Sequence, residues 1–304
     1  MRIDKTVTTR IDAQKCTGCG LCVRVCPDRT LSMSGGKAVV SGVTSLNCGH
    51  CAAVCPVGAV TVGALDEELH TFETFSVTDE RWLPPGRFDT SGLVQLMRSR
   101  RSCRHYLERP VERERLEDLV KIGISAPSGT NSQRWTFTLL PTRRAVLRLG
   151  EEIGRFFRRL NRMAESRLLR GFLKTMGRPE LDDYFHAYYP SVKEGLDEWA
   201  RTGCDRLFHG APAAILVGSK PGASCPKEDA LLATQNILLA AHSMGLGSCL
   251  IGFAVAAMQK DPSIKIAMGI MSKDPVYSVI ALGYPDESYA RPAGRRRPLI
   301  RWVE

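Results

Sequence analysis

Cysteines with a regular spacing are the residues of this sequence that indicate chemistry most clearly. Seven of the eleven cysteines lie between Cys16 and Cys55. The first run follows the pattern C-x2-C-x2-C-x3-C-P, in which thiolates hold iron–sulfur clusters. It consists of Cys16, Cys19, Cys22, Cys26 and Pro27. A shift of 29 residues moves the last four of these onto a second run, which consists of Cys48, Cys51, Cys55 and Pro56. The segment is therefore an internal repeat that predicts two clusters.

The second half of the repeat lacks one cysteine, because the same shift places Cys16 on Ser45. Residues 9–62 resemble a bacterial two-cluster ferredoxin, which implies that the last cysteine of each run binds the other cluster. The implied ligands of cluster one are Cys16, Cys19, Cys22 and Cys55. Cluster two keeps Cys26, Cys48 and Cys51. At its fourth corner, one alternative is an iron bound by the Ser45 hydroxyl or by water. The other is that this iron is absent, which gives a three-iron cluster. Zinc is the alternative for paired cysteines, but seven cysteines and two prolines favour clusters.

Composition and charge narrow the class of protein. Hydrophobic residues make up 43% and charged residues 24% of the chain, as in ordinary globular proteins. We expect a cytoplasmic protein, because no secretory signal or membrane-length apolar run is evident and thiolate ligands need a reducing compartment. The formal net charge of +10 favours anionic partners, either phosphorylated cofactors or acidic electron carriers. Nucleic acid is not expected, because aromatic and basic residues do not interleave.

Arginines and a loop of small polar residues form the second group of residues that could bind a ligand. A helix over 91–100 is predicted to end in Arg100, Arg101, Ser102, Cys103 and Arg104. Guanidinium groups suit phosphate oxygens. The same arginines would lower the pKa of Cys103, but no resolving partner is evident, so we expect Cys103 to be a small filler residue. A helix over 113–122 leads into a loop over 125–133 that can approach a polar ring closely. Alternating apolar residues over 134–140 then predict a strand.

Five motifs in order over residues 90–304 resemble the flavin-dependent nitroreductases. They are RRSCRHY, APSGTNSQRWTF, FHGAPAAILV, QNILLAAHSMGLGSCLIGF, and ALGYP followed by RRRPL. The resemblance implies an α+β fold with a four- or five-stranded, mostly antiparallel sheet flanked by helices. It also implies a homodimer with FMN at each subunit interface. The helix over 231–241 is apolar on nearly every side, and we expect it to be buried all round and to pack across the dimer.

The resemblance also implies roles for individual residues toward FMN. The phosphate, ribityl chain or polar ring edge would be held by Arg100, Arg101, Ser102, Arg104, Arg295 and Arg297. The loop that approaches from the partner subunit contains Pro127, Ser128, Gly129, Asn131 and Gln133. Backbone amides of Ile251 and Gly252 would lie beside the ring near N5. Many relatives carry an acidic residue at the position of Gly252, so the reducing partner stays open.

These features predict three regions and one function. Residues 1–65 form the ferredoxin-like domain, 66–89 a linker, and 90–304 the FMN-binding domain, with a helical insertion at about 151–206 that is either a lid or a dimer-wrapping arm. Tyr184, Tyr188 and Tyr189 of the insertion could donate protons or stack on a substrate, although core packing is the alternative for each. We expect electrons from ferredoxin or flavodoxin to pass through the clusters to FMN and then to a nitroaromatic, a quinone or an activated double bond. The alternatives are an electron relay without its own substrate and a reductase driven by NAD(P)H.

Overall fold

The N-terminal region of the computed structural model, which describes residues 5–79 and 81–304, is a small unit built on the cysteine repeat. Strand β1 (Thr9–Ile11) pairs antiparallel with β4 (Val60–Val62), and β2 (Leu31–Ser34) pairs antiparallel with β3 (Lys37–Val40). Two short helices, α1 (Leu21–Val25) and α2 (His50–Ala53), carry the middle of each cysteine run. Each follows a glycine with positive φ, 71° at Gly20 and 77° at Gly49, a conformation that glycine adopts at little cost. The repeat in the sequence is therefore a repeat in the backbone.

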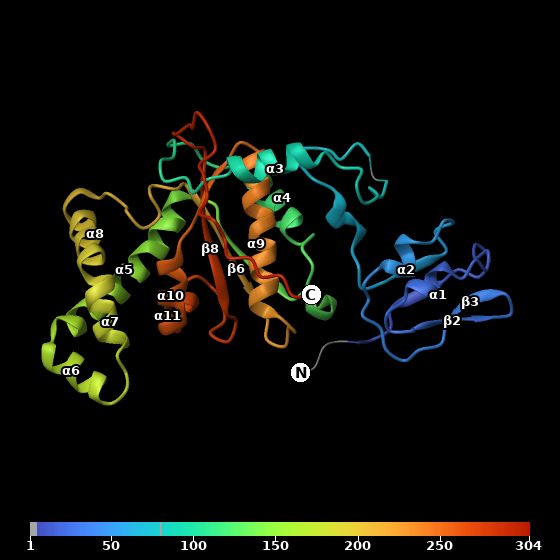
Figure 1. Ribbon diagram of the computed structural model, residues 1–304, viewed down its shortest axis with the longest axis horizontal. Coiled ribbons are helices and arrows are strands. Elements are labelled where there is room, and N and C mark those ends of the chain that lie inside the picture. Colours follow the sequence, from blue (N-terminus) through green and yellow to red (C-terminus); the bar gives the residue numbers. More distant parts are fainter. Residues whose placement is uncertain (1–4, 80) are drawn as a thin grey trace.

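The segment after this unit runs along the larger part of the molecule (Figure 1). It contains the 3₁₀ helix η1 (Glu67–His70) and is attached to α4 (Arg113–Gly123). The buried carboxylate of Asp118 accepts hydrogen bonds from the amides of Glu73 and Thr74, at 3.0 and 2.8 Å, and from the Thr74 hydroxyl at 2.6 Å. Lys121 Nζ donates to the carbonyl of Thr71 at 2.8 Å. The segment is therefore anchored at its middle by polar contacts.

The larger part contains one four-stranded sheet in the order β5-β6-β8-β7, with every pairing antiparallel. The strands are β5 (Trp135–Leu140), β6 (Ala213–Ser219), β7 (Gly247–Leu250) and β8 (Val276–Gly283). All seven residues of β6 are buried, which fits a central strand covered on both faces. The α+β class and the antiparallel sheet are confirmed by this topology.

Helices cover both faces of the sheet (Figure 1). One face packs on α4 and on α9 (Pro226–Ser243), in a core that includes Leu116, Leu119, Ile237 and Ile280. The other face packs on α5 (Arg143–Glu165), α10 (Gly252–Lys260) and α11 (Pro262–Ala267), in a core that includes Leu149, Ile153, Met258 and Val279. Helix α3 (Thr90–Ser99) contacts α9 and begins at Asp89, whose carboxylate accepts from the amides of Ser91 and Gly92.

The helical insertion lies at the end of the molecule opposite the cysteine-rich unit (Figure 1). It consists of α5, α6 (Arg167–Thr175), α7 (Glu180–Ala187) and α8 (Tyr189–Thr202). Helix α5 begins at Arg143, eight residues before the predicted start, because the Thr142 hydroxyl caps it by accepting from the amide of Ala145 at 3.2 Å. The predicted regional limits at 65, 89 and 151–206 stay predictions.

Helix α9 differs from the sequence expectation. Ile237 and Ala241 are fully buried, but Leu231 and Leu232 are 41% and 45% exposed. The prediction that this helix is buried all round is therefore wrong for the single chain, because the sheet, α4 and α3 leave part of its surface uncovered. The uncovered part includes apolar surface near the start of α9.

Candidate functional site

The seven clustered cysteines surround two separate cavities. The first is lined by Cys16, Cys19, Cys22 and Cys55, and the second by Cys26, Cys48 and Cys51. These are the two sets that crossed ligation predicts. In residues 5–79 and 81–304, no three His, Cys, Asp or Glu side chains converge on a point that could hold one metal ion. Thiols spread around a cavity suit a cubane cluster better than a single zinc ion.

The backbone prepares these sulfur atoms to be thiolates. The amide of Thr30 donates to Cys26 Sγ at 3.3 Å, and the amide of Ala59 donates to Cys55 Sγ at 3.2 Å. These contacts are equivalent within the repeat, since Thr30 and Ala59 are 29 residues apart. The amides of Ala38 and Gly18 lower the pKa of Cys16. Amide donors of this kind favour the charged sulfur that iron binds.

Burial acts in the opposite direction on the middle cysteine of each run. It raises the pKa of Cys22 and of Cys51, and the neighbouring thiols add to the effect. Metal binding converts thiols to thiolates and releases their protons, and the metal cation then balances the negative charge of the buried sulfur atoms. The cavities therefore hold thiols that a cationic iron corner would deprotonate. The residues present fit the predicted clusters.

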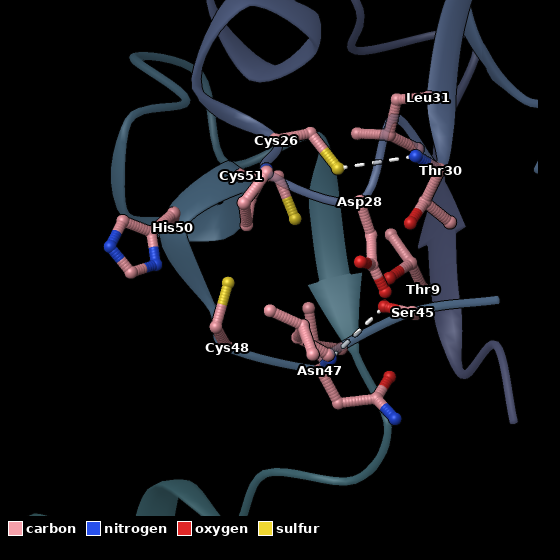
Figure 2. A pocket seen from close by; sticks show the side chains of 13 residues that line it. Thr9, Cys26, Asp28, Thr30, Leu31, Ser45, Asn47, Cys48, His50 and Cys51 are labelled. Carbon is pink, nitrogen blue, oxygen red and sulfur yellow. Dashed lines mark hydrogen bonds between the residues drawn. The ribbon is translucent and has the colours of Figure 1, made fainter. Parts of the chain in front are cut away.

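The fourth side of the second cavity is formed by oxygen-bearing residues (Figure 2). Ser45 is buried, and its Oγ accepts a hydrogen bond from the amide of Asn47 at 3.0 Å. The Asp28 carboxylate lies beside it, whereas Figure 2 shows the His50 ring turned away from the three sulfur atoms. Ser45 is therefore at the predicted corner of the cavity, but it is not the only oxygen donor there.

The predicted phosphate-binding arginines follow α3 along the edge of β7. Ser102 forms a bridge with Ser248, and the amide of Cys103 donates to the carbonyl of Ser248 at 3.0 Å. Burial, followed by the nearby charges of Arg101 and Arg295, lowers the pKa of Arg100. Arg100 and Arg295, distant in sequence, are therefore close enough to repel each other, as in a site built for an anion.

The arginine group lacks acidic partners. Among the ion pairs of the described residues, none involves Arg100, Arg101, Arg104, Arg295 or Arg297. Arg297 lies exposed on the segment after β8, and no contact brings it to Arg100. Uncompensated guanidinium groups beside a partly buried one fit a phosphate that supplies the negative charge. The residues present at Arg100 and Arg295 therefore fit FMN.

Cys103 corrects one expectation. Its side chain is 3% exposed, and burial raises the pKa of its thiol to about 11 instead of lowering it. The thiol donates to the carbonyl of His105 at 3.2 Å, and a Cβ on Gly247 would lie 2.7 Å from its sulfur. Neighbouring arginines in the sequence suggested a thiolate, but desolvation outweighs them because the side chain points into the core. Cys103 is a packing residue.

The small-residue loop is held in an unusual shape that includes the 3₁₀ turn η2 (Gly129–Asn131). Thr130, Asn131 and Gln133 have positive φ values of 52°, 53° and 45°. The buried carboxylate of Asp229 accepts from the amide of Gly129 at 2.8 Å and from the Ser132 hydroxyl at 3.2 Å. A Cβ on Gly129 would lie 2.8 Å from Cys225 Sγ, so only glycine allows this approach. Sequence reasoning missed Asp229, which reads as an ordinary acidic residue of a first helical turn.

Asn131 connects the loop to the cysteine-rich unit. Its side-chain amide donates to the carbonyls of Leu46 and Asn47, both at 3.1 Å, directly before Cys48. Its side-chain oxygen accepts from Gln133 Nε2 at 3.0 Å. The loop predicted to approach the flavin is therefore in contact with the segment that lines the second cavity.

Within one chain, the arginine group and this loop lie at opposite ends of α9. Asp229, in the first turn, holds the loop. His242, in the last turn, has a pKa that is lowered by burial and by the charge of Arg100. They are 13 positions apart in the sequence, which is about 20 Å at the rise of an α-helix. Within one chain, the two groups of residues are therefore about 20 Å apart.

The turn before α10 carries the residues predicted near the flavin ring. The amide of Ile251 donates to the carbonyl of Val279 at 2.8 Å, so it is already used. This corrects the expectation that Ile251 offers its amide to the ring. Gly252 is the first residue of α10 and is exposed, and the first amides of a helix lack partners within it. The backbone donor at this turn is therefore Gly252.

An apolar cavity adjoins the same turn. It is lined by side chains of α5 and α8 and by Phe253 of α10, including Phe157, Leu196 and Trp199. Phe253 contacts Phe157 and Tyr188 edge to face, with ring centroids 5.6 and 5.8 Å apart. The insertion therefore supplies an aromatic wall beside Gly252.

The tyrosines of the insertion have different environments. Tyr184 donates to Asn161 Oδ1 at 2.6 Å, and burial raises its pKa to about 12, so it packs and does not supply protons near neutral pH. Tyr189 donates to Glu165 at 2.7 Å. Tyr188 is half exposed and contacts Phe253. Of the three, Tyr188 is the one placed to stack on a bound molecule.

Comparisons with known proteins agree with both parts of the chain. The model of the nitroreductase family matches residues 97–284, and that of the 4Fe-4S dicluster domain matches residues 15–59. A putative NADH dehydrogenase/NAD(P)H nitroreductase of Archaeoglobus fulgidus is 25% identical over 64% of this chain and 86% of its own length. The 4-nitrobenzoate reductase of Nocardioides sp. is 26% identical over 68% of this chain and 87% of its own length.

A ferredoxin of Thermococcus litoralis is 43% identical over 54 residues, which are 17% of this chain and 92% of that protein. In the solved structures, a nitroreductase with bound FMN from Desulfitobacterium hafniense superposes with a TM-score of 0.50 at 22% identity, over 69% of this chain and 97% of the other. No helix in the described ranges is long and apolar enough to span a membrane. The chain belongs to the nitroreductase family of oxidoreductases, and it carries an N-terminal 4Fe-4S dicluster domain.

Proposed function

We propose that the protein is an FMN-dependent reductase that receives single electrons from an acidic carrier through its two clusters and reduces a small oxidised organic molecule. The observation that carries this proposal is the contact of Asn131 with Leu46 and Asn47. It joins the wall of the second cavity to the loop of the flavin half-site. A cluster domain with no role in flavin reduction would need no such contact.

The order of the two clusters follows from the same contact. Cys48 of the second cluster directly follows Asn47, whereas no hydrogen bond among the described residues joins the loop to a residue that lines the first cavity. Electrons from outside therefore enter at cluster one and leave from cluster two. Both clusters pass one electron at a time, which suits a ferredoxin or flavodoxin as donor and explains why residues 1–65 precede the reductase.

Charge on the cluster unit supports an acidic donor. Residues 5–65 contain six lysines or arginines and two aspartates. Five of the six basic side chains are exposed: Lys5, Arg10, Lys15, Arg24 and Arg29. A positive surface steers a negative carrier toward the cluster unit and raises the rate of encounter.

FMN binding is assigned to two subunits. Arg100, Arg101, Ser102, Arg104 and Arg295 of one chain would hold the phosphate and ribityl chain, with Arg297 reaching the site from the C-terminal segment. The loop from Pro127 to Gln133 would come from the second chain, because about 20 Å of α9 separates the two half-sites. Exposed apolar residues, namely Leu231, Leu232, Leu299, Ile300 and Trp302, give the surface that a second subunit would cover. The active form is therefore a homodimer.

Bound FMN supplies hydride chemistry at N5. The chain positions and shields it: the Gly252 amide meets the polar edge of the ring, and the cavity lined by Phe157, Trp199 and Phe253 excludes water from one side. An apolar, aromatic wall favours planar substrates such as nitroaromatics and quinones. The cavity also favours an enzyme over a pure electron relay, whose flavin would need no space for a second molecule.

The donor is tested by comparing two reductants on the anaerobic full-length protein. Reduced ferredoxin and NADPH are mixed separately with the protein, and flavin absorbance is followed at several salt concentrations. We expect ferredoxin to bleach the flavin faster, with a rate constant that falls as the Debye length shrinks from about 10 Å at 0.1 M to about 3 Å at 1 M. Faster bleaching by NADPH would contradict the proposed donor.

A further inference from the structure

The fourth corner of the second cluster cavity contains a carboxylate that has no partner. Asp28 follows Cys26 by two residues and lines this cavity with Cys48 and Cys51 (Figure 2). Its Oδ2 atom is buried, and no described residue donates a hydrogen bond to it. A buried carboxylate oxygen without a donor or a cation is costly, and proteins normally pair such groups or use them to bind metal. The cavity that Asp28 lines is one direction from which a partner for this oxygen can come.

The internal repeat gives an independent reason to single out this residue. The shift of 29 residues that places Cys16 on Ser45 also places Asp28 on Val57. Val57 lines the first cavity as Asp28 lines the second. Where the first cavity has a cysteine and an apolar side chain, the second therefore has a serine and a carboxylate. The loss of one anionic ligand is matched by the gain of another in the same cavity.

Ser45 is the weaker candidate on chemical grounds. Its hydroxyl must lose a proton before it can replace a thiolate, and its Oγ already accepts the hydrogen bond from Asn47. Carboxylate oxygen, by contrast, is an ordinary ligand for iron in proteins.

We propose that the Asp28 carboxylate binds the fourth iron of cluster two, so that its ligands are Cys26, Cys48, Cys51 and Asp28. This rests on the two-cluster part of the proposed function and not on the donor or the substrate. Binding is a ligand exchange: an Fe²⁺ ion loses water and gains bonds to the carboxylate and to three sulfides of the one-electron-reduced three-iron cluster, with no further change of electron count. Ser45 then supports the Asn47 turn, which carries the contact with Asn131.

The test uses the full-length protein and three variants, D28N, D28C and S45A, each reconstituted anaerobically with excess Fe²⁺ and sulfide and then gel-filtered. Iron per chain and the paramagnetic resonance of the oxidised protein are measured. Two cubane clusters correspond to about eight irons per chain. We expect about eight irons in the wild type, in D28C and in S45A. D28N should hold about seven and show the signal of an oxidised three-iron cluster.

A titration measures the corner directly. Each protein is oxidised until only the fourth iron is lost, and dithionite then returns one electron to the three-iron cluster. Fe²⁺ is added in steps while the signal of the reduced three-iron cluster disappears. The dissociation constant for this iron should be at least about 100-fold higher in D28N than in the wild type, the upper end of the loss seen when an outer-shell partner of a metal is removed. The spectrum of cluster one should be unchanged in every variant, which controls for folding.

The possible outcomes separate this proposal from the rest of the account. Eight irons in D28N, or a loss of iron in S45A but not in D28N, would overturn the role of Asp28 and leave the two-cluster reading intact. Seven irons in the wild type would also overturn it, because cluster two would then be a three-iron cluster. Zinc in place of iron in the wild type would overturn the two-cluster reading itself, and Asp28 with it.

Discussion

Asp229→Ala should release the loop that joins the cluster domain to the flavin half-site. The loop keeps Thr130, Asn131 and Gln133 at positive φ. Each such residue costs roughly 1–2 kcal/mol when it is not glycine, or about 3–6 kcal/mol for the three. This strain must be offset by contacts around the loop, and Asp229 supplies two of them.

The contribution of Asp229 is of the same size as the strain. Its carboxylate accepts from Gly129 and Ser132 at 2.8 and 3.2 Å. Hydrogen bonds to a charged group are worth about 1.5–3 kcal/mol each, so the pair contributes about 3–6 kcal/mol. The remaining contacts of the loop are neutral ones, such as the two made by Asn131 and the one from the Gln133 amide to Ser128 Oγ at 3.1 Å. Without the carboxylate, the strained shape should no longer be the most stable one.

Hydrogen exchange of loop amides and the rate of flavin reduction by ferredoxin are the measurements. In the Asp229→Ala variant, exchange of the Gly129 amide should rise by at least about 100-fold, which corresponds to about 3 kcal/mol. Electron transfer from clusters to flavin should slow, while dithionite still reduces the flavin. Glu228→Gln is the matched control, because Glu228 is exposed on the same turn of α9 and also loses one charge. Unchanged exchange in Asp229→Ala, or an equal rise in the control, would refute the reasoning.

Three further predictions concern other parts of the molecule. Arg100→Ala should weaken FMN retention about 10- to 150-fold, the equivalent of one charge-assisted hydrogen bond, as measured by fluorescence of released flavin, whereas Arg98→Ala should not. Asp118→Asn should lower the free energy of unfolding by about 1.5–3 kcal/mol. Burial alone would raise the pKa of Asp118, but bonds from Thr74 and Glu73 outweigh it and lower the pKa. The stabilising effect of Asp118 is therefore full above the unfolded pKa of about 3.9 and is lost as the pH falls through the lower folded pKa. Urea titrations of wild type and variant measure it at pH 7 and pH 3, and the difference in the free energy of unfolding should be larger at pH 7. Tyr188→Ala should raise KM for a nitroaromatic severalfold with little change in the rate of flavin reduction, and an unchanged KM would remove Tyr188 from the substrate site.

The cysteine spacing carried most of the correct prediction for the N-terminal unit. It predicted two clusters, and the resemblance to two-cluster ferredoxins implied which cysteines cross from one run to the other cluster. The repeat also located the missing cysteine at Ser45. It did not identify Asp28, because a lone carboxylate after a proline resembles a turn residue until its burial is known.

In the larger part of the chain, the helices and strands could be predicted from the sequence, but the burial of individual side chains could not. The strand over 134–140 and the two helices before it lie within one or two residues of their expected limits, since alternation and helical periodicity are local signals. Burial is not local. Cys103 was expected among charges and lies in the core, and Leu231 was expected in the core and lies at the surface. The roles of Asp118 and Asp229 were not predicted for the same reason, because only the fold shows which helix carboxylates accept hydrogen bonds from a loop.

The central claim is that electrons reach the flavin through cluster two. Rapid mixing of reduced ferredoxin with the anaerobic wild-type protein, followed by freeze-quenching and parallel absorbance, measures the order in which the centres are reduced. The account predicts that the clusters are reduced before the flavin, and that Asn131→Ala slows the flavin step but not the cluster step, because the contact with Leu46 and Asn47 is lost while the cysteines of both cavities are unchanged. Flavin reduction that precedes cluster reduction, at a rate that Asn131→Ala does not change, would contradict it.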